Sequence, residues 1–317
     1  MSSSNDMERP EWYERALAAE TEYGEVEVDG CPIHYAVWGE VGRPGVVLIH
    51  GSNAHLEWWR FVAPFLADQF RVAAIDLSGN GDSGWREEVF RRGFRERGDG
   101  GLSRCRVGRA ALCHRPQLWR IRRARNRPSI SVGELGGIIF ADFTVEPPER
   151  YEEWGKEFER RGGEPARPTR VYEDRGTALG RFRLVPSQPC QHPYVIDYLA
   201  TKSLREVEGG WTWKFDPALF DHLEMGVDQR DKFVGIPCRT AILLGEHSDD
   251  SGARAGDYLR ELSGGYLPVF TIPATYHHFM FDEPMATVVA IKGILLERIR
   301  EEHADTIAQR FAEAGSS

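Results

Sequence analysis

The chain has 317 residues, 41% of them hydrophobic, and a formal net charge of −9. That much apolar sequence is enough for a packed core and excludes wholesale disorder. The acidic balance argues against a nucleic-acid-binding protein and against binding to an anionic membrane surface. The five cysteines form no CxxC pair, so neither a disulfide framework nor a zinc site is predicted.

The first residues, Met-Ser-Ser-Ser-Asn-Asp, lack the basic and apolar regions of a signal peptide. No apolar run approaches the length of a membrane span. We therefore expect a cytoplasmic protein that has no membrane partner. Nothing in these residues specifies an oligomeric state.

The first third of the chain has the pattern of a parallel sheet. Two alternating segments are separated by Asp29-Gly30, which is typical of a hairpin turn. Two continuous apolar runs then flank a segment with helical spacing, and strand, helix and strand within about thirty residues make a βαβ unit. The predicted strands are 24–28, 33–38, 46–50 and 71–76, and the predicted helix is 58–66.

The pattern resumes at Leu135 and continues almost to the end of the chain. We predict strands at 137–142, 240–245 and 267–272, and helices at 255–262 and 284–311. The charged, proline-rich and aromatic stretch between them favours a mainly helical lid. The expected organisation is an N-terminal part of the core at 1–147, a lid at 148–225 and a C-terminal part of the core at 226–317.

Several of these segments together resemble the α/β-hydrolase family. They are Val46-Val-Leu-Ile-His-Gly51, the stretch from Ala74 to Gly84, Leu243-Leu-Gly-Glu-His-Ser-Asp249 and the stretch from Ile272 to Pro284. The match covers about 24–90 and 135–300. The resemblance implies an α/β fold, with a mostly parallel sheet covered by helices on both faces. It also implies carboxylic-ester hydrolysis by a serine, an acid and a histidine in that chain order.

The resemblance assigns the base to His277, just after the last predicted strand. Counting back from Asp282-Glu283-Pro284 favours His277 over the adjacent His278. The ordinary alternative is a surface histidine in a turn.

The acid has more than one candidate. Asp249 is favoured, and Asp250 beside it is an alternative, because both lie in the loop after the strand 240–245. The family's commonest spacing would place the carboxylate at Ser248, one residue earlier. Asp142, at the end of the strand 137–142, is the other alternative. The ordinary reading of such loop acids is that they are solvated.

The oxyanion of acyl transfer needs backbone N–H donors. One is expected from Ser52 or Asn53, which follow His50-Gly51, and the other from the residue after the nucleophile. Epoxide hydrolases usually carry a proline two residues after this His-Gly, and Asn53 departs from that pattern.

No nucleophile is found where the family requires one. A G-x-S-x-G motif should follow the Gly79–Gly84 loop by about one helix and one strand, yet nothing between Val89 and Glu134 fits. Residues 91–127 contain thirteen arginines, no lysine and two acids, without any hydrophobic period. Arginine without lysine is what GC-rich DNA yields in a wrong reading frame. We interpret 91–133 as an out-of-frame segment and expect no well-packed structure at 91–130.

The genetic code tests this interpretation. When each codon of residues 114–121 starts one base later, Trp119 followed by Arg120 must encode glycine. Gln117 followed by Leu118 must encode serine or asparagine. The stretch can then read Thr-Gly-His-Ser-Phe-Gly-Gly-Phe, a nucleophile motif at the expected place. The missing serine is therefore expected near Gln117 and Leu118.

Two further interpretations remain open. The chain could be a hydrolase-fold protein kept for binding without catalysis, or the arginine-rich segment could be a genuine insertion that binds nucleic acid. For the hydrolase we expect a small apolar ester-like substrate, because Trp211 and Trp213 enrich the lid in aromatic surface, although such residues equally form a lid core. No metal and no organic cofactor are implied.

Overall fold

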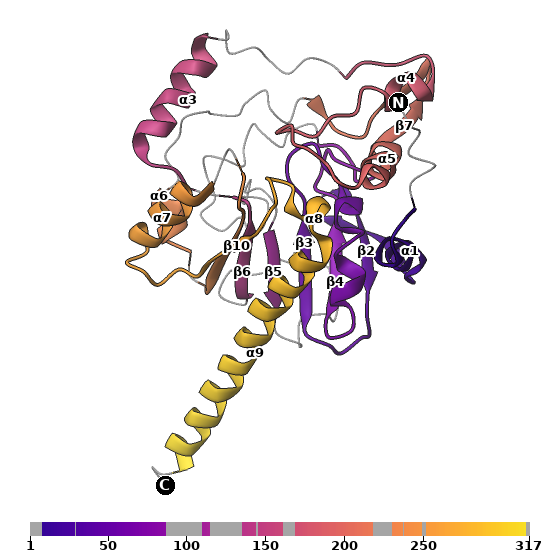
Figure 1. Ribbon diagram of the computed structural model, residues 1–317. Coiled ribbons are helices and arrows are strands. Elements are labelled where there is room, and N and C mark those ends of the chain that lie inside the picture. Colours follow the sequence, from indigo (N-terminus) through magenta and orange to yellow (C-terminus); the bar gives the residue numbers. More distant parts are fainter. Residues whose placement is uncertain are drawn as a thin grey trace.

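The computed structural model describes residues 8–28, 30–86, 110–114, 135–143, 145–160, 169–217, 230–236, 238–248 and 252–314. Its central feature is an eight-stranded sheet with the order β1-β2-β4-β3-β5-β6-β9-β10 (Figure 1). The strands are β1 (Glu22–Val28), β2 (Cys31–Trp38), β3 (Gly45–Ile49), β4 (Arg71–Ile75), β5 (Ala110–His114), β6 (Leu135–Ala141), β9 (Thr240–Gly245) and β10 (Val269–Ile272).

Most strands of this sheet run in one direction. β3 is parallel to β4, and β6, β9 and β10 form a second parallel block. β5 is antiparallel to both β3 and β6, so the two blocks share a direction. β2 is antiparallel to β1 and to β4, so only β2 and β5 run against the rest of the described sheet. The expected α/β class with a mostly parallel sheet is confirmed.

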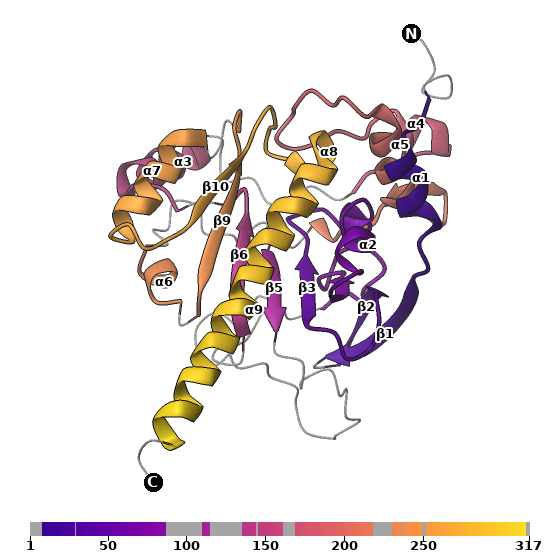
Figure 2. The ribbon, with the colours of Figure 1, turned by 60° about the horizontal axis from the view of Figure 1, so that its bottom comes forward.

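β5 corrects one expectation. We expected no packed structure across 91–130, yet Ala110–His114 forms a strand between β3 and β6. An antiparallel strand satisfies the backbone donors and acceptors of its neighbours as well as a parallel one does. His114 pairs with Gly45 at the start of β3, so the carboxyl end of β5 points away from the edge where β3 and β6 end (Figure 2). Gln117 and Leu118 lie outside the described residues.

Helices cover both faces of the sheet, as expected. In β9, Ala241 and Leu243 join one hydrophobic cluster while Ile242 and Leu244 join another. This alternation places successive side chains on opposite faces. The first cluster packs against α1 (Glu11–Ala18), the 3-10 helix η2 (Leu56–Trp59), α2 (Ala63–Leu66) and α9 (Pro284–Ala314), and the second against α3 (Pro148–Arg160), α6 (Arg230–Val234) and α7 (Gly252–Leu262).

The predicted helix at 58–66 consists of two short pieces, η2 and α2, while α9 matches its prediction closely. None of the described helices is long and apolar enough to cross a membrane.

The region expected to form the lid contains both helices and a hairpin. After α3 come α4 (Arg175–Leu179), α5 (Pro193–Lys202) and the unpredicted hairpin of β7 (Leu204–Val207) and β8 (Gly210–Trp213). The ring of Trp213 lies 6.2 Å from that of Tyr172 and 6.1 Å from that of Phe182. The backbone of Trp211 pairs with Tyr172. Both tryptophans are only half-buried, and the contacts named here are made within this same region.

Hydrogen bonds attach α5 to the loop after β3. His55 Nε2 lies 2.8 Å from Ser203 Oγ, and that hydroxyl donates to the backbone oxygen of Leu199. The imidazole must therefore donate from Nε2. Nearby, the Tyr198 hydroxyl donates to Glu57 Oε2 at 2.6 Å. Because His55 and Ser203 are buried, losing either bond would leave a polar group without water.

The core predicts a large loss of stability for Leu243→Ala. Leu243 is fully buried in the centre of β9, and deleting a buried leucine side chain typically costs about 2–5 kcal/mol. Urea unfolding followed by circular dichroism measures this loss. Val289→Ala is the matched control, because Val289 on α9 is 69% exposed and should change stability by less than about 0.5 kcal/mol. Equal effects of the two substitutions would contradict this core.

His55 predicts a specific loss of stability in acid. Burial lowers the pKa of His55 to about 4, against about 6.5 in an unfolded chain. Between these values only the unfolded chain takes up the proton, so stability falls as the pH drops from 6.5 towards 4. Between pH 7.5 and 4.5 this contribution amounts to about 2–3 kcal/mol.

The variant His55→Gln keeps a donor for Ser203 but cannot titrate in this range. Urea unfolding at both pH values should show a smaller acid loss in the variant than in the parent, by that amount. An identical acid loss in both proteins would show that His55 is not buried in its neutral form.

Candidate functional site

His277 lies in the turn between β10 and the short helix α8 (Phe279–Asp282). Its Nδ1 atom is 2.5 Å from Oδ2 of Asp142, the residue that directly follows β6. The side chain of His277 is 22% exposed, whereas that of Asp142 is fully buried. The buried carboxylate of Asp142 can thus orient the imidazole of His277 through Nδ1, while the ring remains partly exposed to solvent.

The carboxylate of Asp142 is also held by two further donors. Its Oδ1 accepts a hydrogen bond from Gly245 N at 2.9 Å, and its Oδ2 accepts one from Ser248 Oγ at 2.6 Å. Hydrogen bonds to a charged group contribute about 1.5–3 kcal/mol each. Asp142 adopts a left-handed backbone with φ of 49°, a conformation that is uncommon outside glycine. This turn directs the carboxylate towards β9 and the His277 turn.

The turn after β10 packs closely on the end of β9. His247 N donates to Thr275 O at 2.8 Å, and Glu246 N donates to Ile272 O at 3.2 Å. At Gly245 an added Cβ would lie 2.2 Å from Tyr276 O, so only glycine fits at this approach. The ends of β6, β9 and β10 therefore meet at one edge of the sheet.

The structure brings some predicted site residues together and leaves others outside its description. His277 contacts Asp142, the alternative acid, while Asp249 and Asp250 lie outside the described residues. Ser248, at the family's commonest acid position, donates its hydroxyl to Asp142 instead. The sequence indicates that position but gives no signal for this hydrogen bond.

His278 has a different environment from His277. It is 1% exposed, and its ring lies 5.5 Å from that of Trp58 and 5.8 Å from that of Phe281. Trp58 belongs to η2, which follows the His50-Gly51 turn. The turn after β3 and the turn after β10 are thus packed against each other through aromatic rings.

The expected oxyanion donors lie at the same edge of the sheet. Ser52 and Asn53 are exposed and follow β3 after His50 and Gly51, and Asn53 has a left-handed φ of 56°. The buried His50 stabilises this turn, because its Nε2 accepts a hydrogen bond from Leu77 N at 2.9 Å and its Nδ1 lies 2.7 Å from Gly51 O.

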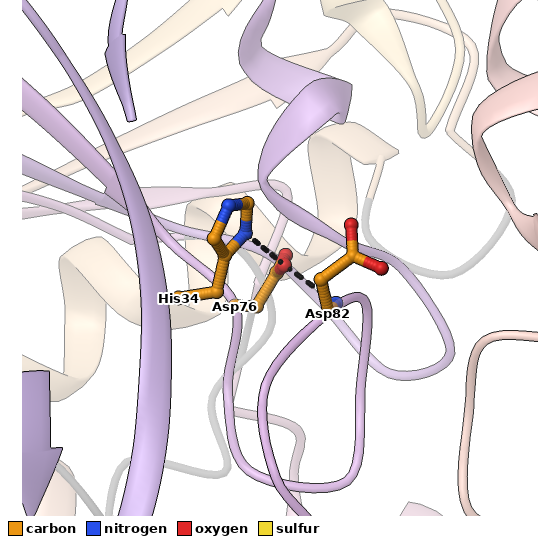
Figure 3. Close-up of side chains that lie close together, drawn as sticks. All are labelled: His34, Asp76 and Asp82. Carbon is orange, nitrogen blue, oxygen red and sulfur yellow. Dashed lines mark hydrogen bonds and ion pairs between the residues drawn. The ribbon is translucent and has the colours of Figure 1, made fainter. Parts of the chain in front are cut away.

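A second cluster of ionisable groups lies after β4. His34, Asp76 and Asp82 have potential metal ligands within 4.8 Å of one another (Figure 3). Asp76 already accepts hydrogen bonds from Leu56 N at 2.6 Å and from Asp82 N at 2.9 Å, and it contacts His34 Nδ1 at 3.0 Å. The ammonium of Lys214 lies 2.7 Å from Asp82 Oδ1. These contacts occupy the carboxylates of Asp76 and Asp82 and hold the loop after β4 in place. The cluster therefore gives no reason to assign a metal ion.

A cavity of about 290 Å³ adjoins this cluster, and its lining includes Tyr23, His34, His55, Lys202 and Lys214. Hydrogen bonding to Asp76 raises the pKa of His34 above its usual range. Asp142 and His277 do not line this cavity. The cavity beside His34 and the Asp142–His277 pair are therefore separate sites.

Short segments of the chain are similar to known enzymes. It is 40% identical over 67 residues to a soluble epoxide hydrolase of Corynebacterium sp. (strain C12), which covers 21% of this chain and 23% of the relative. It is 52% identical over 40 residues to the pimeloyl-[acyl-carrier protein] methyl ester esterase of Methylococcus capsulatus, covering 13% of this chain and 16% of the esterase. These matches span less than a quarter of either relative.

The whole fold is similar to solved structures. The thioesterase domain from the curacin biosynthetic pathway superimposes with a TM-score of 0.60 at 18% identity, covering 88% of this chain and 99% of that domain. At this identity the likeness shows the fold alone. The model of the alpha/beta hydrolase family matches residues 46–291, more than half of the sequence. The chain therefore belongs to the α/β-hydrolase family.

Proposed function

We propose that the reaction for which this site is built is hydrolysis of a small ester by a serine, Asp142 and His277, and that the present chain lacks the serine and is inactive. The observation that carries the proposal is the 2.5 Å contact between His277 Nδ1 and the buried carboxylate of Asp142. A histidine held at Nδ1 by an acid is oriented to take a proton at Nε2, as a general base must.

The burial of Asp142 supports an orienting role. Its side chain is fully buried and accepts hydrogen bonds from Gly245 N and Ser248 Oγ in addition to the contact with His277. A nucleophile must reach the substrate, so a carboxylate enclosed in this way serves to fix the imidazole and to stabilise its protonated form.

The choice of Asp142 over Asp249 rests on the same contacts. Ser248 donates to Asp142, so the loop after β9 supports the acid through a hydroxyl. Asp142 also keeps the family's chain order, because it follows the expected nucleophile position and precedes His277. Asp249 and Asp250 remain the alternative acids.

The reading frame supports an ester substrate. In the shifted frame the codon that begins in Gln117 starts with adenine, so it encodes serine or asparagine and never aspartate, whose codons begin with guanine. Opening an epoxide through a covalent ester would need a carboxylate there. A hydroxyl nucleophile, with backbone N–H groups of Ser52 or Asn53 as oxyanion donors, suits acyl transfer.

The proposal predicts different turnover of p-nitrophenyl acetate by two versions of the chain. The present chain should show no turnover beyond that of its own His277→Ala variant, because no hydroxyl stands at the nucleophile position. A version in which residues 91–133 are read in the restored frame should hydrolyse the ester. Replacing the restored serine by alanine, or His277 by alanine, should remove that activity.

Two results would contradict the proposal. One is turnover by the present chain that His277→Ala abolishes, because it would reveal another nucleophile. The other is a folded, restored chain without turnover of acetate, butyrate or octanoate esters, which would favour a binding protein.

Substitution of the candidate carboxylates identifies the acid in the restored enzyme. Asp142→Asn keeps the side-chain shape but removes the charge that orients His277, so kcat should fall by about 10⁴-fold, as for other triad acids. Asp249→Asn and Asp250→Asn are matched controls and should leave kcat within about threefold of the parent. A large loss in Asp249→Asn with full activity in Asp142→Asn would reassign the acid.

A further inference from the structure

Gln188 connects the segment before α5 to the turn that carries His277. Its Oε1 accepts a hydrogen bond from His278 N at 2.7 Å, and its Nε2 lies 3.0 Å from both oxygens of Asp282. The amide orientation is fixed by its partners, because His278 N can only donate and the carboxylate can accept from the amide nitrogen.

Asp282, at the end of α8, is hydrogen-bonded to the residue just before His277. Its Oδ2 accepts a hydrogen bond from Tyr276 N at 2.8 Å, and the residue is 2% exposed. The residues on both sides of His277 are therefore attached through their backbone N–H groups, Tyr276 to Asp282 and His278 to Gln188. Gln188 contacts both parts of this arrangement.

The chain around Gln188 is itself anchored to the core. Leu184 is buried in the hydrophobic cluster on the α9 face of the sheet. His192 Nδ1 lies 2.7 Å from the hydroxyl of Tyr194, and the ring of Trp12 lies 5.2 Å from that of His192. The amide of Gln188 is thus presented from a fixed segment and can set the position of the turn.

We propose that Gln188 is a positioning residue for His277, whose amide couples docking of the segment at 184–192 to the orientation of the base. The inference rests on the proposed role of His277 as the base. When the segment is docked, the turn at 276–282 is held at both sides of the histidine. When it is displaced, His278 N loses its acceptor, Asp282 keeps only the hydrogen bond from Tyr276 N, and the ring of His277 loses its fixed direction towards Asp142.

The test uses the full present chain, labelled with ¹⁵N-histidine for ring spectra and uniformly with ¹⁵N for amide exchange. The parent should show His277 as one tautomer with its proton on Nδ1, and protection of the Tyr276 and His278 amides by at least about a hundredfold. Gln188→Met has nearly the same shape but cannot make these hydrogen bonds. It should accelerate exchange at His278 N about tenfold and mix the tautomers of His277.

The matched control is Gln191→Met, in the same segment but exposed, which should change neither readout. If Gln188→Met does not fold, Gln188→Asn, which keeps the amide but is one methylene shorter, should give the same two changes. Unprotected Tyr276 and His278 amides in the folded parent would overturn the proposal without any variant.

Two failures are distinguishable. If the parent shows the single tautomer and Gln188→Met leaves it and the exchange rates unchanged, the positioning role is wrong while the pairing of His277 with Asp142 stands. If the parent itself shows mixed tautomers of His277, the proposed base and acid are wrong, and the role of Gln188 fails with them.

Discussion

The buried carboxylate of Asp142 is the group on which the arrangement of this site depends. A carboxylate removed from water is costly unless hydrogen bonds replace its hydration. Gly245 N, Ser248 Oγ and His277 Nδ1 provide those contacts, and they come from the end of β9, the loop after it and the turn after β10. Two separate segments, 245–248 and the turn after β10, must therefore meet at the end of β6, and the absence of a side chain at Gly245 lets the His277 turn approach closely enough.

The strand order determines which loops can meet there. β6, β9 and β10 are adjacent and parallel, so their carboxyl ends lie side by side. The neighbour on the other side, β5, runs the opposite way, and Ala110 at its start pairs with Ile49 at the end of β3. A strand in the forward direction would deliver its following loop between the turn after β3 and Asp142. The short segment Ala110–His114 fills the gap in the sheet, and its carboxyl end lies at the opposite edge.

Much of the fold could be predicted because buried parallel strands are apolar throughout and have clear boundaries. The segments 46–50, 71–76 and 240–245 were placed correctly within a residue, and α9 was predicted almost to its end. The direction of β5 could not be predicted, since an apolar pentapeptide has no feature that distinguishes parallel from antiparallel pairing. The hairpin of β7 and β8 was missed because its aromatic and charged residues resemble those of the surrounding helical region.

The site was predictable only where local order along the chain identified it. His277 could be located by its distance from the Asp282-Glu-Pro sequence, whereas its contact with Asp142 spans 135 positions of sequence. No local pattern distinguishes Asp142 from Asp249, because each follows a buried strand by a short interval. The contacts of Gln188 depend on how an irregular segment crosses the sheet edge, and a single glutamine in a polar stretch gives no signal for that.

One stretch of the chain, residues 188–203, is hydrogen-bonded both to the turn that carries His277 and to the turn after β3. At its start, Gln188 binds the turn of His277 through His278 N, and at its end Ser203 binds the turn after β3 through His55. The stretch between them includes α5, whose Tyr198 adds a bond to Glu57. The turn that carries His277 and the turn that carries the expected oxyanion donors are therefore both hydrogen-bonded to one continuous stretch of the chain, residues 188–203. These hydrogen bonds join residues outside 91–133, whereas the sheet beneath the two turns includes β5 from that segment.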